Sequence, residues 1–227
     1  MNFKMSISQN LKQIQSELPE HVTLVAVSKT KPNSDIMQAY DVGQRIFGEN
    51  KIQDMVEKHE QLPKDIKWHM IGHVQRNKIK YMASFVNLIH GVENLKVLKE
   101  VDKQAAKHDR IIDCLLQIKI ASEDSKFGMM ASEALEIIGS EEFSELKNVM
   151  ITGVMGMATF TEDHEQIKAE FTHLKSTFDH LKEFQSRNCK MQTISMGMSG
   201  DYKLAIDSGS TMIRVGSRIF GTRNYSN

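Results

Sequence analysis

Residues 22–47 read VTLVAVSKTKPNSDIMQAYDVGQRIF, and the fold prediction starts from this stretch. An apolar run of strand length at 22–27 precedes a segment with helical periodicity at 33–42, and a second strand-like run follows at 45–47. Strands that alternate with helices pair in parallel. Pro32 stands at the boundary between the first strand and the helix, where it interrupts neither element. The stretch therefore predicts a β-α-β unit of an α/β protein.

The same alternation continues along nearly the whole sequence. Because no linker or low-complexity segment interrupts it, we expect one domain over residues 1–227. Eight alternating strands and helices close most naturally into a single TIM (β/α)8 barrel, and a doubly wound sheet is the alternative. The remaining strands are predicted at 67–71, 85–90, 111–119, 149–154, 192–196 and 212–215. The remaining helices are predicted at 50–60, 75–82, 93–107, 130–139, 162–186 and 200–208, with an added N-terminal helix at 1–18.

Composition excludes several classes of function. Lys plus Arg and Asp plus Glu both number 29, so the chain lacks the positive field that binding to nucleic acid or an anionic membrane usually needs. Cys114 and Cys189 lie far apart and outside any CxxC spacing, which disfavours a disulfide framework or a zinc site. No apolar run of spanning length and no signal-type N-terminus occurs. We expect a soluble cytoplasmic protein.

Lys29 stands just past the first predicted strand, at the end of a run that is otherwise apolar. Ligands of parallel barrels gather at the carboxyl ends of the strands. Desolvation there lowers the pKa of a lysine amine and makes it a nucleophile that forms a Schiff base with an aldehyde. An ordinary surface lysine at the start of a loop is the alternative, and position alone does not separate the two.

The turns after the last two predicted strands are rich in Gly and hydroxyl residues. Ser199 and Gly200 are expected to open the helix at 200–208, where backbone N–H groups and the helix dipole favour a phosphate. Gly216 and Ser217 follow strand eight, and a phosphate held by the loops after strands seven and eight is a recurrent barrel arrangement. Each glycine taken alone is also compatible with an ordinary turn.

An amine at strand one and phosphate-binding turns at strands seven and eight describe a ligand with both an aldehyde and a phosphate. Pyridoxal 5′-phosphate (PLP) is that ligand. The alternative is a barrel enzyme that acts on a sugar phosphate without PLP. Six motifs distributed along the chain contain or surround these residues or lie between them: VAVSKTKP (25–32), FGEN (47–50), WHMIGHVQRNK (68–78), SKFGM (125–129), SMGMSGD (195–201) and IRVGSRIFG (213–221).

In sequence and order these motifs resemble the pyridoxal phosphate homeostasis protein family, also called the YggS or PROSC family. The resemblance implies a TIM barrel of PLP fold type III, similar to the barrel domain of alanine racemase. It implies that Lys29 holds PLP as an internal aldimine, that Ser199 and Gly200 form the phosphate turn, and that Gly216 and Ser217 form a second phosphate loop. The family often has Thr where this chain has Ser217.

Four more residues are assigned by the same resemblance. Arg214 is expected to face the pyridine nitrogen and to keep it unprotonated, with a barrel-wall arginine paired to a carboxylate as the alternative. Asn50 and His69 are expected beside the ring, although a lone His on an apolar strand is more often a core residue. Met155 or Met196 is expected to touch the ring. His73 stands where the family usually has Leu, and the HMIGH spacing lacks the third ligand of a metal site.

The family implies a PLP-binding protein that buffers the cofactor or delivers it to PLP-dependent apo-enzymes. An amino-acid racemase is the alternative. Racemisation on this fold needs a second base opposite Lys29, and alanine racemase takes that base from a tyrosine of a second subunit's extra domain. That domain is absent from this sequence, and none of the four tyrosines lies in a motif opposite Lys29. We therefore expect a non-catalytic protein and, without a second domain for dimerisation, a monomer.

Overall fold

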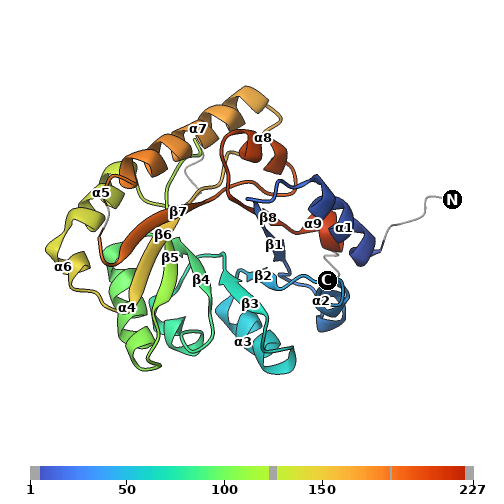
Figure 1. Ribbon diagram of the computed structural model, residues 1–227, viewed down its shortest axis with the longest axis horizontal. Coiled ribbons are helices and arrows are strands. Elements are labelled where there is room, and N and C mark those ends of the chain that lie inside the picture. The colour runs from blue at the N-terminus through green and yellow to red at the C-terminus, as the bar shows by residue number, and fades with distance from the viewer. Residues whose placement is uncertain (1–5, 123–126, 185, 223–227) are drawn as a thin grey trace.

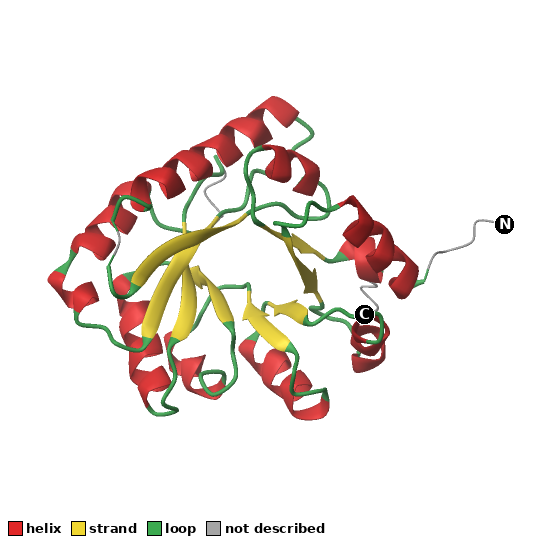
Figure 2. Cartoon of the chain, viewed as in Figure 1, coloured by secondary structure: helices red, strands yellow, loops and turns green. Residues whose placement is uncertain are grey.

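The computed structural model describes residues 6–122, 127–184 and 186–222 and shows a closed barrel of parallel strands with helices outside it (Figures 1 and 2). The predicted TIM barrel is confirmed, and each predicted strand overlaps an observed one. Every strand pairs with the next along the chain, and the eighth pairs with the first. The strands are β1 (Thr23–Val27), β2 (Ile46–Glu49), β3 (Lys67–Met70), β4 (Leu88–Val92), β5 (Ile112–Gln117), β6 (Val149–Met155), β7 (Cys189–Ser195) and β8 (Met212–Val215).

The helices confirm the predicted alternation but differ from it in detail. Residues 75–82 contain a 3-10 helix where an α-helix was predicted, and two four-residue helices were not predicted at all. The N-terminal helix predicted at 1–18 begins after Ser6, whose side chain accepts a hydrogen bond from the Gln9 N–H in a capping box. The elements are α1 (Ile7–Glu17), α2 (Asn33–Tyr40), α3 (Ile52–Gln61), η1 (Arg76–Tyr81), α4 (Leu95–Ala106), α5 (Ala131–Gly139), α6 (Glu141–Ser144), α7 (His164–Leu181), α8 (Tyr202–Asp207) and α9 (Ser217–Phe220).

The fourth strand begins three residues later than predicted. Residues 85–90 were assigned to it because they are mostly apolar, but Phe85 and Val86 instead donate their N–H groups to the Met82 carbonyl. These bonds continue the turn that follows η1. Strand pairing therefore begins at Leu88, which lies opposite His69 of β3.

Alternate residues of the strands build two separate apolar layers. Val25, Leu115 and Met155 belong to a small cluster inside the barrel. Leu24 and Ala26, on either side of Val25, belong to the larger layer between the strands and the surrounding helices. Among the described residues, no helix combines the length and hydrophobicity that crossing a bilayer requires.

The two strands that close the ring come from opposite ends of the chain. β1 and β8 pair at four positions, from Thr23 opposite Met212 to Ala26 opposite Val215. Outside them, α1 packs against α9, and the Asn10 side chain donates to the Ile219 carbonyl at 3.0 Å. Ring closure therefore places the loop after β1 beside the loop after β8.

Candidate functional site

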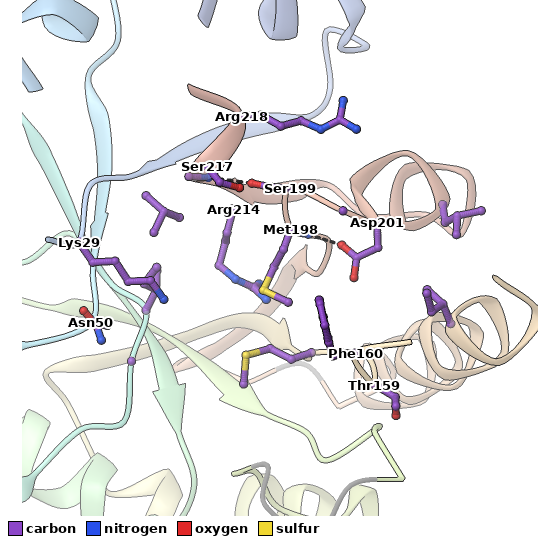
Figure 3. Close-up of a pocket in the computed structure, with 18 of the residues that line it drawn as sticks. Lys29, Asn50, Thr159, Phe160, Met198, Ser199, Asp201, Arg214, Ser217 and Arg218 are labelled. Atoms are coloured by element: carbon purple, nitrogen blue, oxygen red, sulfur yellow. Dashed lines mark hydrogen bonds between the residues drawn. The ribbon is translucent and has the colours of Figure 1, made fainter. Parts of the chain in front are cut away.

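A cavity of about 1160 Å³ opens at the carboxyl ends of the strands. Seven of the nine predicted site residues line it: Lys29, Asn50, Ser199, Gly200, Arg214, Gly216 and Ser217. In Figure 3, Lys29 and Asn50 enter the pocket from one side, and Arg214, Ser199 and Ser217 enter it from the other. The structure thus brings together residues that the sequence separates by almost 190 positions.

A tight turn after β1 orients Lys29. The Lys31 N–H donates to the Ser28 carbonyl at 3.0 Å, and Thr30 adopts a left-handed φ of 65°. This conformation is unfavourable for a β-branched residue, so the surrounding structure must compensate for the local strain. The turn leaves Lys29 half-buried with its side chain on the pocket wall (Figure 3).

Lys31, two residues further on, is held by the end of the last helix. Its Nζ donates to the carbonyls of Phe220, Gly221 and Thr222 at 2.9, 3.3 and 3.5 Å. A cation at the C-terminus of a helix satisfies carbonyl groups that the helix leaves without partners. Lys31 therefore ties the loop after β1 to α9.

A buried ion pair lies behind the turn that carries Lys29. Glu49 ends β2 with a fully buried side chain, and its Oε1 accepts from Lys58 Nζ at 2.7 Å and from Ser28 Oγ at 2.6 Å. Lys58 also donates to the Ser28 carbonyl at 3.0 Å. Burial raises the pKa of Glu49, and the hydrogen bonds and charge of Lys58 and Ser28 offset only part of that effect. The cluster fixes Ser28, the residue immediately before Lys29.

The two predicted phosphate loops are joined by a hydrogen bond. The Gly216 N–H donates to Ser199 Oγ at 3.2 Å, shown as a dashed line in Figure 3. The predicted start of the helix at Gly200 is wrong, because residues 199–201 form a turn and α8 begins at Tyr202. Asp201 Oδ1 accepts the Met198 N–H at 2.5 Å and holds this turn closed. Any anion here would be bound by turn N–H groups and hydroxyls, not by the dipole of a long helix.

Arg214 is almost fully buried, yet its side chain forms part of the pocket wall. Its guanidinium donates to the Ser195 carbonyl at 2.9 Å, to Ser195 Oγ at 2.6 Å and to the Gly156 carbonyl at 3.0 Å. Burial lowers its pKa to about 10, and the charge of Asp201 acts in the opposite direction. Arg214 therefore remains a cation at neutral pH. Its three acceptors named here are two carbonyls and a hydroxyl, and none of the three is a carboxylate.

Two predicted site residues do not line the cavity. His69 lies inside the barrel, with its Nδ1 3.1 Å from His90 Nε2, while Ile71, two residues further along the chain, reaches the pocket wall. Met196 points outward into the layer between the strands and the helices. Their assignment rested on closeness to a strand end, which fixes neither the depth nor the face of a side chain.

The methionines at the pocket are Met157 and Met198, the second of each MGM triplet. The sequence motifs instead predict Met155 or Met196 at the ring. Met155 instead packs inside the barrel. Both pocket methionines lie past the last paired residue of their strands, where the chain turns over the mouth. Position beyond the strand end was the signal that could have identified them.

The HMIGH histidines do not converge on a common site. His69 is buried in the barrel, whereas His73 is exposed at the pocket rim, 3.2 Å from both carboxylate oxygens of Glu93. The His73 ring stacks on Phe127 with a centroid distance of 5.0 Å. Phe127 also lines the pocket, while Ser125 and Lys126 of the SKFGM motif lie outside the described residues.

Glu170 of α7 anchors the loop after β6 at the other side of the rim. Its carboxylate accepts from the Thr159 N–H at 2.6 Å, from Thr159 Oγ1 at 2.7 Å and from Gln166 Nε2 at 3.1 Å. Burial alone would raise the pKa of Glu170, but these hydrogen bonds outweigh it and lower the pKa. Thr159 itself lines the pocket, so α7 sets the position of this part of the wall.

Comparison with known proteins identifies relatives of this chain. Residues 5–224 match the family described as "Alanine racemase, N-terminal domain". The chain is 37% identical to the pyridoxal phosphate homeostasis protein of Pasteurella multocida, over 98% of this chain and all of that protein. It is 33% identical to the protein of the same name from Escherichia coli K12, over 97% of this chain and 98% of that one.

Solved structures agree with the sequence comparison. PipY of Synechococcus elongatus with PLP bound superposes with a TM-score of 0.85 at 32% identity, covering 95% of this chain and all of PipY. Alanine racemase from E. faecalis superposes with a TM-score of 0.72 at 15% identity, covering 97% of this chain and 59% of the racemase. The second match shows a shared barrel fold.

Proposed function

The chain belongs to the alanine racemase N-terminal domain family and, within it, to the pyridoxal phosphate homeostasis proteins, and from this membership we propose that it binds PLP in the pocket at Lys29. The observation that carries the proposal is the meeting of Lys29 with two joined glycine- and serine-containing turns in one cavity. Binding of this kind lets the protein buffer the cofactor or deliver it to apo-enzymes. We further propose that it does so as a monomer.

The residues of the pocket fit PLP in charge and polarity. Arg218 contributes positive charge, and Ser199 and Ser217 contribute hydroxyls near the turn N–H groups, which suits a phosphate, while Arg214 contributes a cation for the ring nitrogen. Apolar side chains of the wall, including Met157, Met198 and Ile71, suit the faces of an aromatic ring. A Cβ at Gly216 would lie 3.2 Å from the Val27 carbonyl oxygen, so glycine lets this turn pack against the end of β1.

Lys29 is the better candidate for the covalent link. PLP supplies an aldehyde, which condenses reversibly with a primary amine and releases one water molecule. Of the two lysines that line the described part of the pocket, Lys31 has its ammonium bound by three carbonyls of the α9 end. These bonds hold the Lys31 side chain against the α9 end. Lys29 stands on the wall opposite the phosphate turns.

The racemase alternative lacks a tyrosine base in the described part of the chain. Tyr40 donates to Asp65, Tyr202 donates to Glu17, and Tyr81 is the exposed last residue of η1. None of the three lines the pocket, and Tyr225 lies outside the described residues. A carrier needs only the amine and the phosphate turns, so these positions favour binding over racemisation.

We expect the purified protein to bind PLP in a one-to-one ratio, with a visible absorption band that appears on titration. In deuterated water, single-enantiomer amino acids incubated with the loaded protein should keep their α-protons. An apo-enzyme should gain activity from the loaded protein at least as fast as from free PLP. Absence of the band after titration would overturn PLP binding, and rapid α-deuteration would overturn the carrier role while leaving binding intact.

The link between the phosphate loops should matter only to ligands with a phosphate. In Ser199→Ala the hydroxyl that accepts the Gly216 N–H is lost, and we expect PLP affinity to fall about five- to tenfold, as for one lost hydrogen bond. Affinity for pyridoxal, which lacks the phosphate, should change little. Ser208→Ala is the matched control, because Ser208 caps the end of α8 and donates to the Leu204 carbonyl of that helix. An equal loss for both ligands would contradict a phosphate-specific role.

A further inference from the structure

Four polar side chains form a hydrogen-bonded row through the barrel interior below the pocket. Arg214 Nη1 lies 2.6 Å from Ser195 Oγ, Ser195 Oγ lies 3.1 Å from His90 Nδ1, and His90 Nε2 lies 3.1 Å from His69 Nδ1. Each of the four residues is at most 5% exposed. The row runs from β8 through β7 and β4 to β3, and only Arg214 lines the pocket. Barrel interiors of this fold are usually filled with branched apolar residues, so such a row needs an explanation.

The hydrogen bonds of the row favour one direction for its protons. A guanidinium only donates, so Ser195 Oγ accepts from Arg214, and His90 Nδ1 is the acceptor within reach of the Ser195 hydroxyl proton; the opposite direction would leave that buried proton without an acceptor among the described residues. His90 therefore carries its proton on Nε2 and donates it to His69 Nδ1. The proton of His69 in turn lies on Nε2. One fixed donor at the pocket thus determines the tautomers of both imidazoles.

The surroundings keep both imidazoles neutral. Burial lowers the pKa of His69 to about 3, and the charge of Lys67 adds to this effect. Burial also lowers the pKa of His90, with further contributions from His69 and from the cation of Arg214. A neutral His90 is what the row requires, because a protonated ring has no acceptor for the Ser195 hydroxyl. The hydrogen-bond geometry and the lowered pKa therefore both indicate a neutral His90.

We propose that His90 and Ser195 are positioning residues, which orient Arg214 and hold its guanidinium on the pocket wall for the bound cofactor. Ser195 supplies two of the three acceptors of that guanidinium, and His90 keeps the Ser195 hydroxyl turned so that its lone pairs face Arg214. The choice of PLP as ligand rests on the proposed function. The proton arrangement of the row does not depend on it.

The proton arrangement is tested by ¹⁵N NMR of the imidazoles in the wild-type protein without PLP. Signals are assigned by their loss in His69→Gln and His90→Gln. We expect both rings to be neutral at pH 7 with the proton on Nε2. In Ser195→Ala the His90 signal should shift towards a mixture of tautomers, because its Nδ1 loses the hydroxyl donor. A wild-type His90 with its proton on Nδ1, or a doubly protonated ring, would overturn the proposal whether or not PLP binds.

The positioning role is tested by two variants at one position. In His90→Leu, a replacement that can pack but not accept, we expect PLP affinity to fall about tenfold, as for one buried hydrogen bond. In His90→Gln the amide offers an acceptor and a donor separated by one carbon, as in the imidazole, and we expect affinity within about twofold of wild type. Wild-type affinity in His90→Leu would show a packing role alone and overturn the proposal. Should His90→Leu not fold, an affinity loss in His90→Gln as large as in Ser195→Ala would do the same.

Discussion

Lys29→Ala is expected to abolish the visible absorption band of the PLP-loaded protein and to lower affinity for PLP at least about a hundredfold, or about 2.7 kcal/mol. The amine at position 29 is the group proposed to condense with the aldehyde, and the phosphate turns alone would retain PLP only weakly. The measurement is a titration followed by absorbance, together with borohydride reduction and mass spectrometry to identify the modified peptide. In the wild-type protein the label should lie on Lys29.

Three variants control this experiment. Lys29→Arg keeps the positive charge but cannot form the covalent link, so it should lose the band as Lys29→Ala does. Lys31→Ala removes the bonds to the α9 end and should keep the band, with weaker retention of the cofactor. Lys99→Ala, on the exposed face of α4, should behave as wild type. A band that persists in Lys29→Ala and disappears in Lys31→Ala would assign the covalent role to Lys31.

Lys58→Met is expected to destabilise the protein by about 3–5 kcal/mol, because it leaves the buried Glu49 carboxylate without its charged partner. The second oxygen of this carboxylate, Oε2, has no hydrogen-bond partner among the described residues, so little is available to compensate. Chemical denaturation measures the change. Lys99→Met is a matched control: Lys99 pairs with Glu142 at the same 2.7 Å, but both side chains are exposed. Its expected cost is below about 1 kcal/mol.

The cost of Lys58→Met should also grow with pH. Burial raises the pKa of Glu49 in the folded protein, so the folded state holds this proton more tightly than the unfolded chain. The stability contributed by Glu49 therefore falls as pH rises from the unfolded value through the folded pKa. Without Lys58, whose charge lowers that pKa, the fall continues to higher pH. Glu49→Gln/Lys58→Met should recover much of the stability and lose this pH dependence. A destabilisation that is equal at pH 5 and pH 8 would contradict a buried carboxylate.

The strands could be predicted because each is an apolar run bounded by polar residues, and parallel pairing follows from the alternation with helices. The short helices could not. α6 and α9 are single turns, set by the Ser140 cap and by the Lys31 bonds to the α9 end, and such segments carry no periodicity. The 3-10 helix at Arg76–Tyr81 reads as an α-helix because the two differ in hydrogen bonding, not in composition.

The lining of the pocket could be predicted where its residues lie in loops just past strand ends, as do Lys29, Ser199 and Gly216. The lining could not be predicted where it depends on how deep a side chain lies in the barrel or on which face of the sheet it projects from. His69 faces the barrel interior but lies below the pocket, and Met196 faces the helices. The row from Arg214 to His69 was also missed, because Ser195 and His90 meet only when β4 and β7 face each other across the ring. Because the two residues lie far apart in the sequence, no local pattern indicates that contact.

The pairing of β1 with β8 also fixes when during synthesis the protein can first hold its cofactor. A nascent chain that has left the ribosome up to β7 already carries Lys29, but it has neither Gly216 nor the partner strand that aligns β1. An N-terminal fragment of that length has the amine but lacks both turns proposed to bind the phosphate. Ligand binding therefore stabilises only the closed ring, and the binding free energy acts on the last step of folding rather than on the first. PLP binding therefore indicates that the barrel has closed.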